Sequence, residues 1–206
     1  MKAKSQSVQN RAVIFDLGNV VIDWNVDGIL NSLGLETEQQ KLLGKELFHH
    51  QDWLDLDHGI ESELNVISKI CQRSSLNRDL VERAFQTAKG SLYPISETLL
   101  LMQELSSSGI RMFCLSNMSR ETYAHIQSMD FFDMFSGIVI SGIEGCMKPD
   151  DEIFHLTLNR FDLDPVDTLF VDDSLVNIDT ARRLGINGYH FKRSKNCYLE
   201  LRALLF

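Results

Sequence analysis

The sequence predicts an α/β fold, a Rossmann-like parallel sheet with helices on both faces. Four short apolar runs indicate the strands, at residues 12–15, 112–115, 138–140 and 169–171. They are rich in β-branched and aromatic residues and do not alternate with polar ones, which is typical of strands buried on both faces of a parallel sheet. Helix-like segments such as 96–107 and 152–160 separate them, and this alternation favours βαβ units.

The first of these runs ends on Asp16, which a loop containing Gly18 and Asn19 follows. A carboxylate at this position lies where a buried strand opens into a crevice, and open α/β sheets place their chemistry at the carboxyl ends of strands. Taken alone, Asp16 is also consistent with an aspartate that only caps a turn. Its functional interpretation therefore depends on the residues that follow the other strands.

Each of the later runs also leads into polar residues. These are Ser116 and Asn117 after the second run, Lys148 shortly after the third, and Asp172 and Asp173 after the fourth. Right-handed crossovers bring the carboxyl ends of parallel strands to the same edge of a sheet. We therefore expect these five side chains to converge with Asp16 on one site.

This ordered set resembles the haloacid dehalogenase (HAD) superfamily, over residues from about 11 to 191. The family has an aspartate after its first strand, a Ser/Thr-Asn pair after the second, a Lys-Pro, and then an acidic pair. Any one of these motifs is common by chance, whereas all four in order form a strong signal. The Asp-Leu-Gly-Asn-Val form of the first motif is most similar to the branch that contains the bacterial α-D-glucose-1-phosphate phosphatase.

The resemblance implies a Mg²⁺-dependent phosphatase that acts on a small phosphorylated metabolite, for example a sugar phosphate such as glucose 1-phosphate. Asp16 is then the nucleophile and forms an aspartyl-phosphate. Lys148 contributes a positive charge near it, while Ser116 and Asn117 serve both in catalysis and in binding the phosphoryl group. The expected metal ligands are Asp16, the backbone carbonyl of Gly18, Asp172 and Asp173, with Asp172 in direct contact or one shell removed.

Gly18 departs from the family pattern. Phosphatases of the family usually carry a second aspartate two residues after the nucleophile, and it serves as general acid and then as general base. Without it, the proton must come from a neighbour such as Asn19 or Asp23, from a residue such as His58, or from water.

Residues 24–93 show a different sequence pattern from the rest of the chain, with apolar residues at helical spacing and no convincing strand. The resemblance implies a helical cap subdomain over 24–93, inserted in an α/β core made of residues 11–23 and 94–206. The polar and aromatic cluster 48–59 is the natural source of substrate contacts, and we expect Trp53 and His58 to make them.

The resemblance implies a small-molecule phosphate ester as the partner, and the composition argues against other classes of partner. The net charge of −9 argues against nucleic acid or an anionic membrane as the main partner, because both attract clustered Lys and Arg. Residues 1–10 lack the apolar core of a signal peptide, and the four cysteines show no CxxC spacing. We therefore expect a cytoplasmic protein with reduced thiols; the sequence gives no expectation for its oligomeric state.

Two other functions fit the same motifs. A 2-haloacid dehalogenase uses the same nucleophile on carbon but needs no metal, so the acidic pair argues against it, and activity without metal would identify it. A catalytically silent HAD fold used for binding or regulation is favoured by Gly18, and a turnover test with a generic aryl phosphate would distinguish it.

Overall fold

The computed structural model describes residues 12–206 and contains a five-stranded sheet in the order β3-β2-β1-β4-β5. The strands are β1 (Ala12–Phe15), β2 (Arg111–Ser116), β3 (Gly137–Ile140), β4 (Thr168–Asp172) and β5 (Asn187–His190). Every neighbouring pair is parallel. The predicted fold class is thus confirmed, and β1 to β4 coincide with the four apolar runs. Residues 1–10 and residue 11, where the predicted core begins, lie outside the described residues.

The fifth strand was not predicted from the sequence. It lies at an edge of the sheet and pairs only with β4 within residues 12–206. Its four residues are Asn-Gly-Tyr-His and are half-buried or exposed, so they lack the apolar pattern that marks the central strands. An edge strand covers less of the core and therefore needs less apolar surface.

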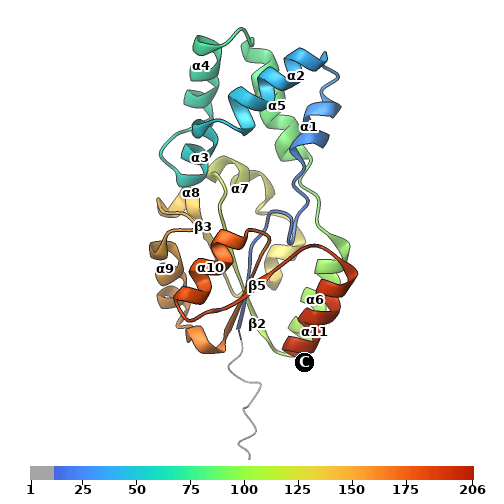
Figure 1. Ribbon diagram of the computed structural model, residues 1–206, viewed down its shortest axis with the longest axis vertical. Helices are drawn as coiled ribbons and strands as arrows, with labels where there is room; N and C mark the ends of the chain where they lie inside the picture. Colours follow the sequence, from blue (N-terminus) through green and yellow to red (C-terminus); the bar gives the residue numbers. More distant parts are fainter. Residues whose placement is uncertain (1–11) are drawn as a thin grey trace, which may run out of the picture.

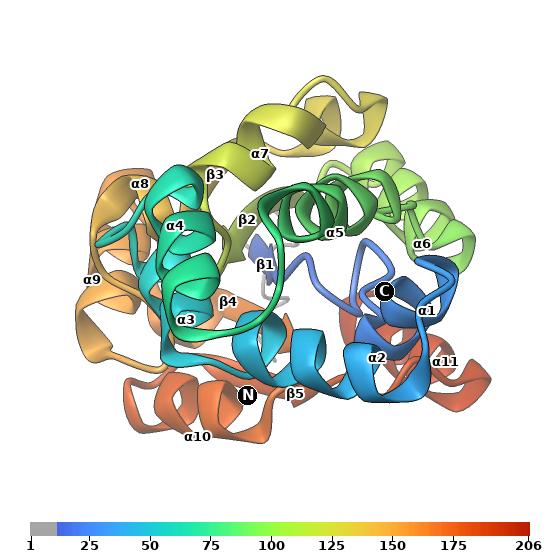
Figure 2. The same cartoon turned by 90° about the horizontal axis from the view of Figure 1, so that it is seen from above.

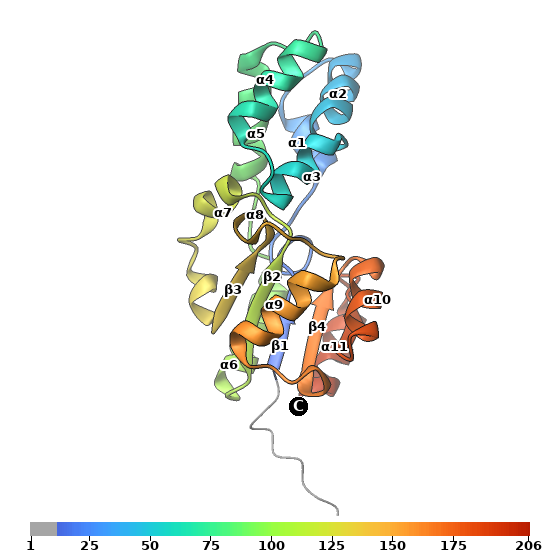
Figure 3. The ribbon, with the colours of Figure 1, turned by 90° about the vertical axis from the view of Figure 1, so that its left-hand side faces the viewer.

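Helices cover both faces of the sheet (Figure 3). On one face, α6 (Ser96–Ser107) and α11 (Lys195–Leu205) pack against Val13 and Phe15. On the other, α9 (Asp151–Phe161) and α10 (Leu175–Arg183) pack against Ala12 and Ile14. Successive side chains of β1 therefore enter two separate cores, and each large apolar side chain buried there contributes about 1.5–3 kcal/mol.

Short helices follow the strands at their carboxyl ends. They are α7 (Arg120–Ile126) after β2 and α8 (Ser141–Glu144) after β3, with the 3₁₀ turns η3 (Asp130–Met134) and η4 (Pro165–Asp167) leading into β3 and β4. The side-chain hydroxyl of Ser119 caps α7 by accepting a hydrogen bond from the backbone N–H of Thr122 at 3.1 Å.

A second group of helices forms the end of the molecule beyond the carboxyl ends of the strands (Figure 1). Its members are α1 (Val26–Ser32), α2 (Thr37–Leu43), the π-helical turn η2 (Gly44–Phe48), α3 (Gln51–His58), α4 (Glu63–Arg73) and α5 (Arg78–Gly90). We call residues 26–90 the helical group. Seen from above, it covers the end of the sheet, with β1 beneath it (Figure 2).

Local signals explain where these helices begin. The side chains of Asn25, Ser62 and Asn77 accept hydrogen bonds from backbone N–H groups in the first turns of α1, α4 and α5. Apolar residues of α4 and α5 face each other and build a core separate from the two cores of the sheet. The boundaries at residues 23 and 94 stay a prediction. Within residues 12–206, no helix is long and apolar enough to cross a membrane.

Candidate active site at the carboxyl ends of the strands

Asp16 lies at the centre of this sheet edge, directly after β1. Its backbone N–H donates to the carbonyl of Val171 at 2.9 Å, which continues the ladder between β1 and β4 by one residue. Because β1 lies between β2 and β4, the carboxyl group of Asp16 is flanked by the ends of both neighbouring strands. The side chain is buried, in a place where ionised groups need partners.

Lys148 is that partner. Its Nζ lies 2.8 Å from Oδ1 of Asp16 and 2.7 Å from Oδ2 of Asp172, and it donates to the carbonyl of Leu115 at 2.8 Å. These three acceptors match the three protons of an ammonium group, so a fully buried charge is satisfied. The geometry fixes the positive charge between two carboxylates.

Burial governs the ionisation of this pair. It opposes the charged form of Lys148, but the carboxylates of Asp16 and Asp172 outweigh it and raise the pKa of the lysine. Burial also raises the pKa of Asp16 to about 7; the Lys148 ammonium opposes that rise and the charge of Asp172 adds to it. The site thus holds one permanent cation beside a carboxyl group whose charge depends on its surroundings.

Asn117 fixes the backbone of Lys148. Its side-chain amide donates to the Lys148 carbonyl at 2.8 Å, and its side-chain oxygen accepts from the Lys148 N–H at 2.9 Å. This reciprocal pair ties the loop after β3 to the end of β2. Ser116, the last residue of β2, is buried beside it. The predicted residues Asp16, Ser116, Asn117 and Lys148 therefore do come together.

The acidic pair divides into two environments. Oδ1 of Asp172 accepts from the backbone N–H of Ser174 at 2.7 Å, and both carboxylate oxygens lie 3.1 Å from the amide nitrogen of Asn177. Asp173 is less buried and accepts from the side-chain amide of Asn19 at 3.1 Å. Burial raises the pKa of Asp173 as well.

Three carboxylates form a cluster that could hold a cation. Asp16, Asp172 and Asp173 each offer an oxygen, and these oxygens lie within 4.8 Å of one another. Hard oxygen donors of this kind suit Mg²⁺. Uncompensated, three acids in one buried place repel each other, and a single lysine neutralises only one of them.

Sequence reasoning missed the role of Asn19. Its backbone has a positive φ of 57°, a conformation that asparagine tolerates better than most residues. Its N–H donates to the carbonyl of Ile22 at 2.8 Å, its side-chain oxygen lies 3.3 Å from the N–H of Trp24, and its amide nitrogen contacts Asp173. Asn19 therefore links the loop after β1 to the acidic pair, and an asparagine directly after glycine was the available signal.

A cavity of about 100 Å³ lies between the residues that follow β1 and β2 and the helical group. Gly18, Ser116 and Asn117 line it on the side of the sheet, and Trp53 and Asp57 of α3 line it on the side of the helical group. The remaining lining residues are the apolar Ile22, Trp24, Leu92 and Met118 and the polar Thr122. Trp53 stacks between two rings, with centroids 5.5 Å from Trp24 and 6.0 Å from Phe85. The stacking fixes the indole of Trp53 in the cavity wall, and its predicted substrate contact stays a prediction.

His58 is placed differently from the expectation. Its Nε2 lies 2.9 Å from the carbonyl of Gly145, at the end of α8, and the side chain does not line the cavity. Its neighbour Asp57, which also belongs to the predicted cluster 48–59, does line it. The predicted substrate contact of His58 stays a prediction.

The end of α3 is held firmly against the core. Ser141 Oγ donates to the carbonyl of Asp57 and accepts from the backbone N–H of Met118 at 2.9 Å. Arg120 Nη2 reaches the carbonyls of Gly59 at 3.3 Å and of Gly142 at 2.7 Å. These contacts position α3 over the carboxyl ends of the strands.

Gly59 permits this close approach, and Gly59→Ala is expected to disrupt it. The residue has φ +81°, and an added Cβ would lie 2.4 Å from the carbonyl oxygen of Gly142. Gly34→Ala is the matched control, because Gly34 also has a positive φ of +65° but open space around its Cβ. The control should cost about 1–2 kcal/mol from backbone strain. Gly59→Ala should lower the free energy of unfolding in urea clearly more than the control does. Equal losses would show that the backbone at Gly142 moves easily to make room for the added methyl group.

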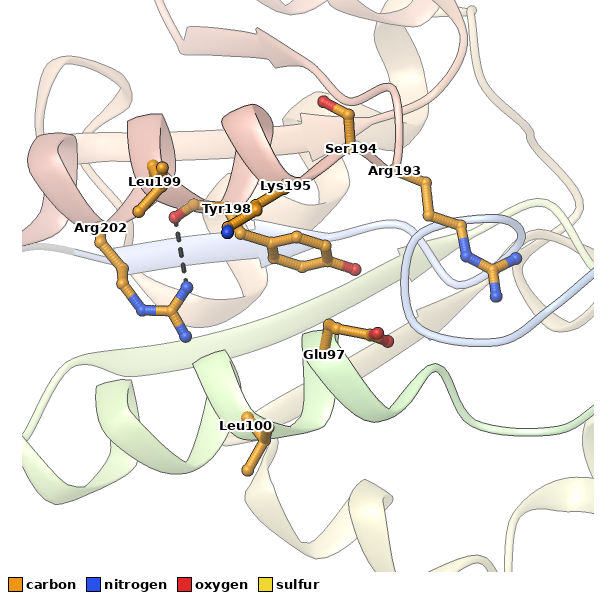
Figure 4. A pocket seen from close by; sticks show the side chains of 8 residues that line it. All are labelled: Glu97, Leu100, Arg193, Ser194, Lys195, Tyr198, Leu199 and Arg202. Atoms are coloured by element: carbon orange, nitrogen blue, oxygen red, sulfur yellow. Dashed lines mark hydrogen bonds between the residues drawn. The ribbon is translucent and has the colours of Figure 1, made fainter.

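A larger hollow of about 520 Å³ lies elsewhere, between α6 and α11 (Figure 4). Two of its arginines are already engaged, Arg193 with Asp23 and Arg202 with Glu104. None of the residues of the acidic cluster or of the smaller cavity lines this hollow. The candidate active site is therefore the smaller cavity.

Comparison with known proteins identifies the family of this chain. A family model described as haloacid dehalogenase-like hydrolase matches residues 10–185. The chain is 27% identical over 198 residues to the sesquiterpene phosphatase astK of Aspergillus oryzae, covering 95% of this chain and 96% of the relative.

Two solved structures illustrate the shared fold. One is a HAD family enzyme from Bacteroides thetaiotaomicron in complex with magnesium and inorganic phosphate (TM-score 0.71, 20% identity, 90% of this chain and 96% of that one). The other is the L-2-haloacid dehalogenase of Xanthobacter autotrophicus (TM-score 0.66, 15% identity, 95% and 82%). The fold, the ordered motifs and the match of the family model lead to one conclusion: the chain belongs to the haloacid dehalogenase-like hydrolases.

Proposed function

We propose that this hydrolase is a Mg²⁺-dependent phosphatase that cleaves a small phosphate monoester through an aspartyl-phosphate on Asp16. The observation that carries the proposal is the contact of Asp16 with the buried ammonium of Lys148, within a cluster of three carboxylates and near a partly open cavity. The likeness to a sesquiterpene phosphatase supports phosphate-ester chemistry. A fold neighbour crystallised with magnesium and phosphate supports the choice of metal.

In this mechanism a carboxylate oxygen of Asp16 attacks phosphorus and the bond to the leaving oxygen breaks. Lys148 holds the nucleophile in place through its 2.8 Å contact and offsets charge on the phosphoryl group. Asn117 keeps Lys148 in register through its two backbone hydrogen bonds. The hydroxyl of Ser116, which lines the cavity, is available to a phosphoryl oxygen. Water then releases phosphate and regenerates Asp16.

The residues present fit a magnesium ion. Asp16, Asp173 and the backbone carbonyl of Gly18 would hold it, and Asp172 completes the acidic cluster. Bound there, Mg²⁺ would neutralise charge on the phosphate ester and on the surrounding carboxylates. Asp172 already accepts hydrogen bonds from Ser174 and Asn177, whereas Asp173 accepts one from Asn19. Asp173 therefore has more unoccupied oxygen lone pairs to offer a metal ion than Asp172 has.

We further propose that the helical group, residues 26–90, is the cap of the active site and sets substrate choice. Its α3 covers part of the cavity and would limit the access of water during transfer. Most cavity walls are apolar, and two tryptophans, Trp24 and Trp53, lie among them. This favours an ester whose organic group is largely apolar. The sugar phosphate suggested by the motifs stays a prediction.

The proposed function predicts loss of activity when the metal is removed. Hydrolysis of para-nitrophenyl phosphate should stop in EDTA and return with excess Mg²⁺, because uncompensated carboxylates would repel the ester.

In the same assays, kcat/KM for a short prenyl monophosphate should exceed that for glucose 1-phosphate. Chloride release from 2-chloropropionate in EDTA would instead identify a dehalogenase, and no turnover of any of these compounds would identify a silent fold.

A further inference from the structure

The site as described lacks a proton donor for the leaving group. Gly18 stands where a second carboxylate is usual in phosphatases of this family, and glycine carries no proton to give. Of the other residues considered, Asp23 pairs with Arg193, and His58 contacts the carbonyl of Gly145. Asn19 is an amide and contacts Asp173. An alkoxide leaving group still needs a proton in the transition state.

Asp57 is the residue that the structure offers for this role. Among the described residues that line the cavity, it is the one with an acidic side chain. It comes from α3, so it faces Gly18, Ser116 and Asn117 across the cavity, on the side opposite the nucleophile's strand. A group there would meet the leaving oxygen of an ester whose phosphoryl group lies at Asp16 and whose organic part extends into the cavity.

The position of Asp57 is well defined. Its carbonyl accepts from Ser141 Oγ, and the following turn is held by Arg120 through Gly59. The backbone N–H of Ser119 and the indole of Trp53 interact with its carboxyl group. A half-buried acid that the core holds over the strand ends is a costly arrangement for stability alone, since burying a carboxyl group is unfavourable unless it is fully paired.

We propose that Asp57 is the general acid and general base of this enzyme, taking the part that an aspartate at position 18 would otherwise play. The proposal rests on the phosphatase function proposed above and adds a catalytic residue to it.

The proton balance is complete. As an oxygen of Asp16 bonds to phosphorus, the bond from phosphorus to the alkoxide oxygen breaks and the carboxyl proton of Asp57 passes to that oxygen, which releases the alcohol. Asp57, now a carboxylate, takes a proton from a water molecule whose oxygen attacks the phosphorus of the aspartyl-phosphate. The bond from phosphorus to Asp16 breaks, phosphate leaves, and both aspartates return to their starting forms.

The ionisation of Asp57 is consistent with this role. Burial raises its pKa to about 7, and the charge of Asp16 adds to the rise, while the hydrogen bonds from Ser119 and Trp53 oppose it. A carboxyl group with a pKa near the working pH is available in both its acid and its base form.

The test compares two leaving groups in Asp57→Asn. With an alkyl phosphate, kcat/KM should fall by about 10²–10⁴-fold, because the alkoxide receives no proton. With para-nitrophenyl phosphate, whose phenolate leaves without help, rapid mixing should show a burst of about one phenolate per site at a rate within a few-fold of the wild type. Slow turnover should follow, because water is no longer activated. Asp55→Asn, on the same helix but bonded to Gln51 at 3.0 Å, is the control and should behave as the wild type.

A second variant tests the same role at the other position. The Cβ of residue 18 would meet no atom within 4 Å, so a side chain can be added there. Gly18→Asp in the Asp57→Asn background should recover at least about tenfold in alkyl phosphate hydrolysis if proton transfer is what was lost.

Three results separate the possibilities. If the wild type hydrolyses both esters and Asp57→Asn keeps alkyl activity within about threefold, the role of Asp57 is wrong while the phosphatase function stands. If the variant is folded but loses the aryl burst to the same extent as alkyl turnover, Asp57 positions the substrate rather than transferring a proton. The proposal is then also wrong. If the wild type hydrolyses neither ester, the proposed function itself fails.

Discussion

Asp16→Asn is expected to reduce kcat for aryl phosphate hydrolysis by on the order of 10⁴-fold or more. The amide has the shape of the carboxylate but neither its charge nor its nucleophilicity, so no bond to phosphorus forms. The backbone hydrogen bond from Asp16 to Val171 does not involve the side chain, so the end of β1 should keep its place. Steady-state rates with para-nitrophenyl phosphate at saturating Mg²⁺ measure the effect.

Two controls make this result specific. The variant should unfold in urea as cooperatively as the wild type, and rapid quenching should trap a phosphorylated protein from the wild type but not from Asp16→Asn. A near-normal rate in the variant would mean that another residue or a bare water attacks phosphorus. The covalent mechanism would then be wrong, although the fold and the family would remain.

Lys148→Met should have the largest effect on stability. The substitution keeps a long side chain but removes the ammonium from between Asp16 and Asp172, which lie 2.8 and 2.7 Å from it. Removing one partner of a buried ion pair costs about 3–5 kcal/mol, because the charges left behind have no compensation. Urea unfolding in EDTA measures this loss without any contribution from a bound metal.

Arg183→Met is the matched control for Lys148→Met. Arg183 forms an ion pair of 2.6 Å with Asp151, but both side chains are about half exposed to solvent. Pairs of this kind contribute about 0–1 kcal/mol, because water screens them. Equal losses in the two variants would contradict the view that Lys148 compensates the buried acids.

The sequence was sufficient to predict the parts of the site that lie directly after strands. Asp16 and Asp172 follow β1 and β4 without an intervening loop, so strand prediction and parallel topology place them at one edge. Lys148 is farther from its strand, and its position depends on Asn117, thirty-one residues earlier in the chain. The motif order indicated that they converge, and the reciprocal hydrogen bonds could be found only in the structure.

The contribution of the helical group was harder to predict. The cluster 48–59 was identified, yet the structure favours Asp57 over His58 as the residue that faces the cavity. Adjacent residues of a helix point about 100° apart, so the choice depends on how α3 is rotated about its axis. That rotation is set by contacts with Ser141 and Gly142, more than eighty residues away in sequence. No local pattern carries that information.

Because β1 lies between β2 and β4, a chain emerging from the ribosome cannot pair both sides of β1 until residues 168–172 have been made. Up to that point β1 has β2 on one side and, on the other, a row of unpaired backbone groups flanked by apolar side chains. Such an edge is a template for pairing with other chains, and parallel pairing over long sequence separations forms slowly. Fragments that end before residue 168 therefore lack the partner of the central strand, and they should aggregate where the full chain folds.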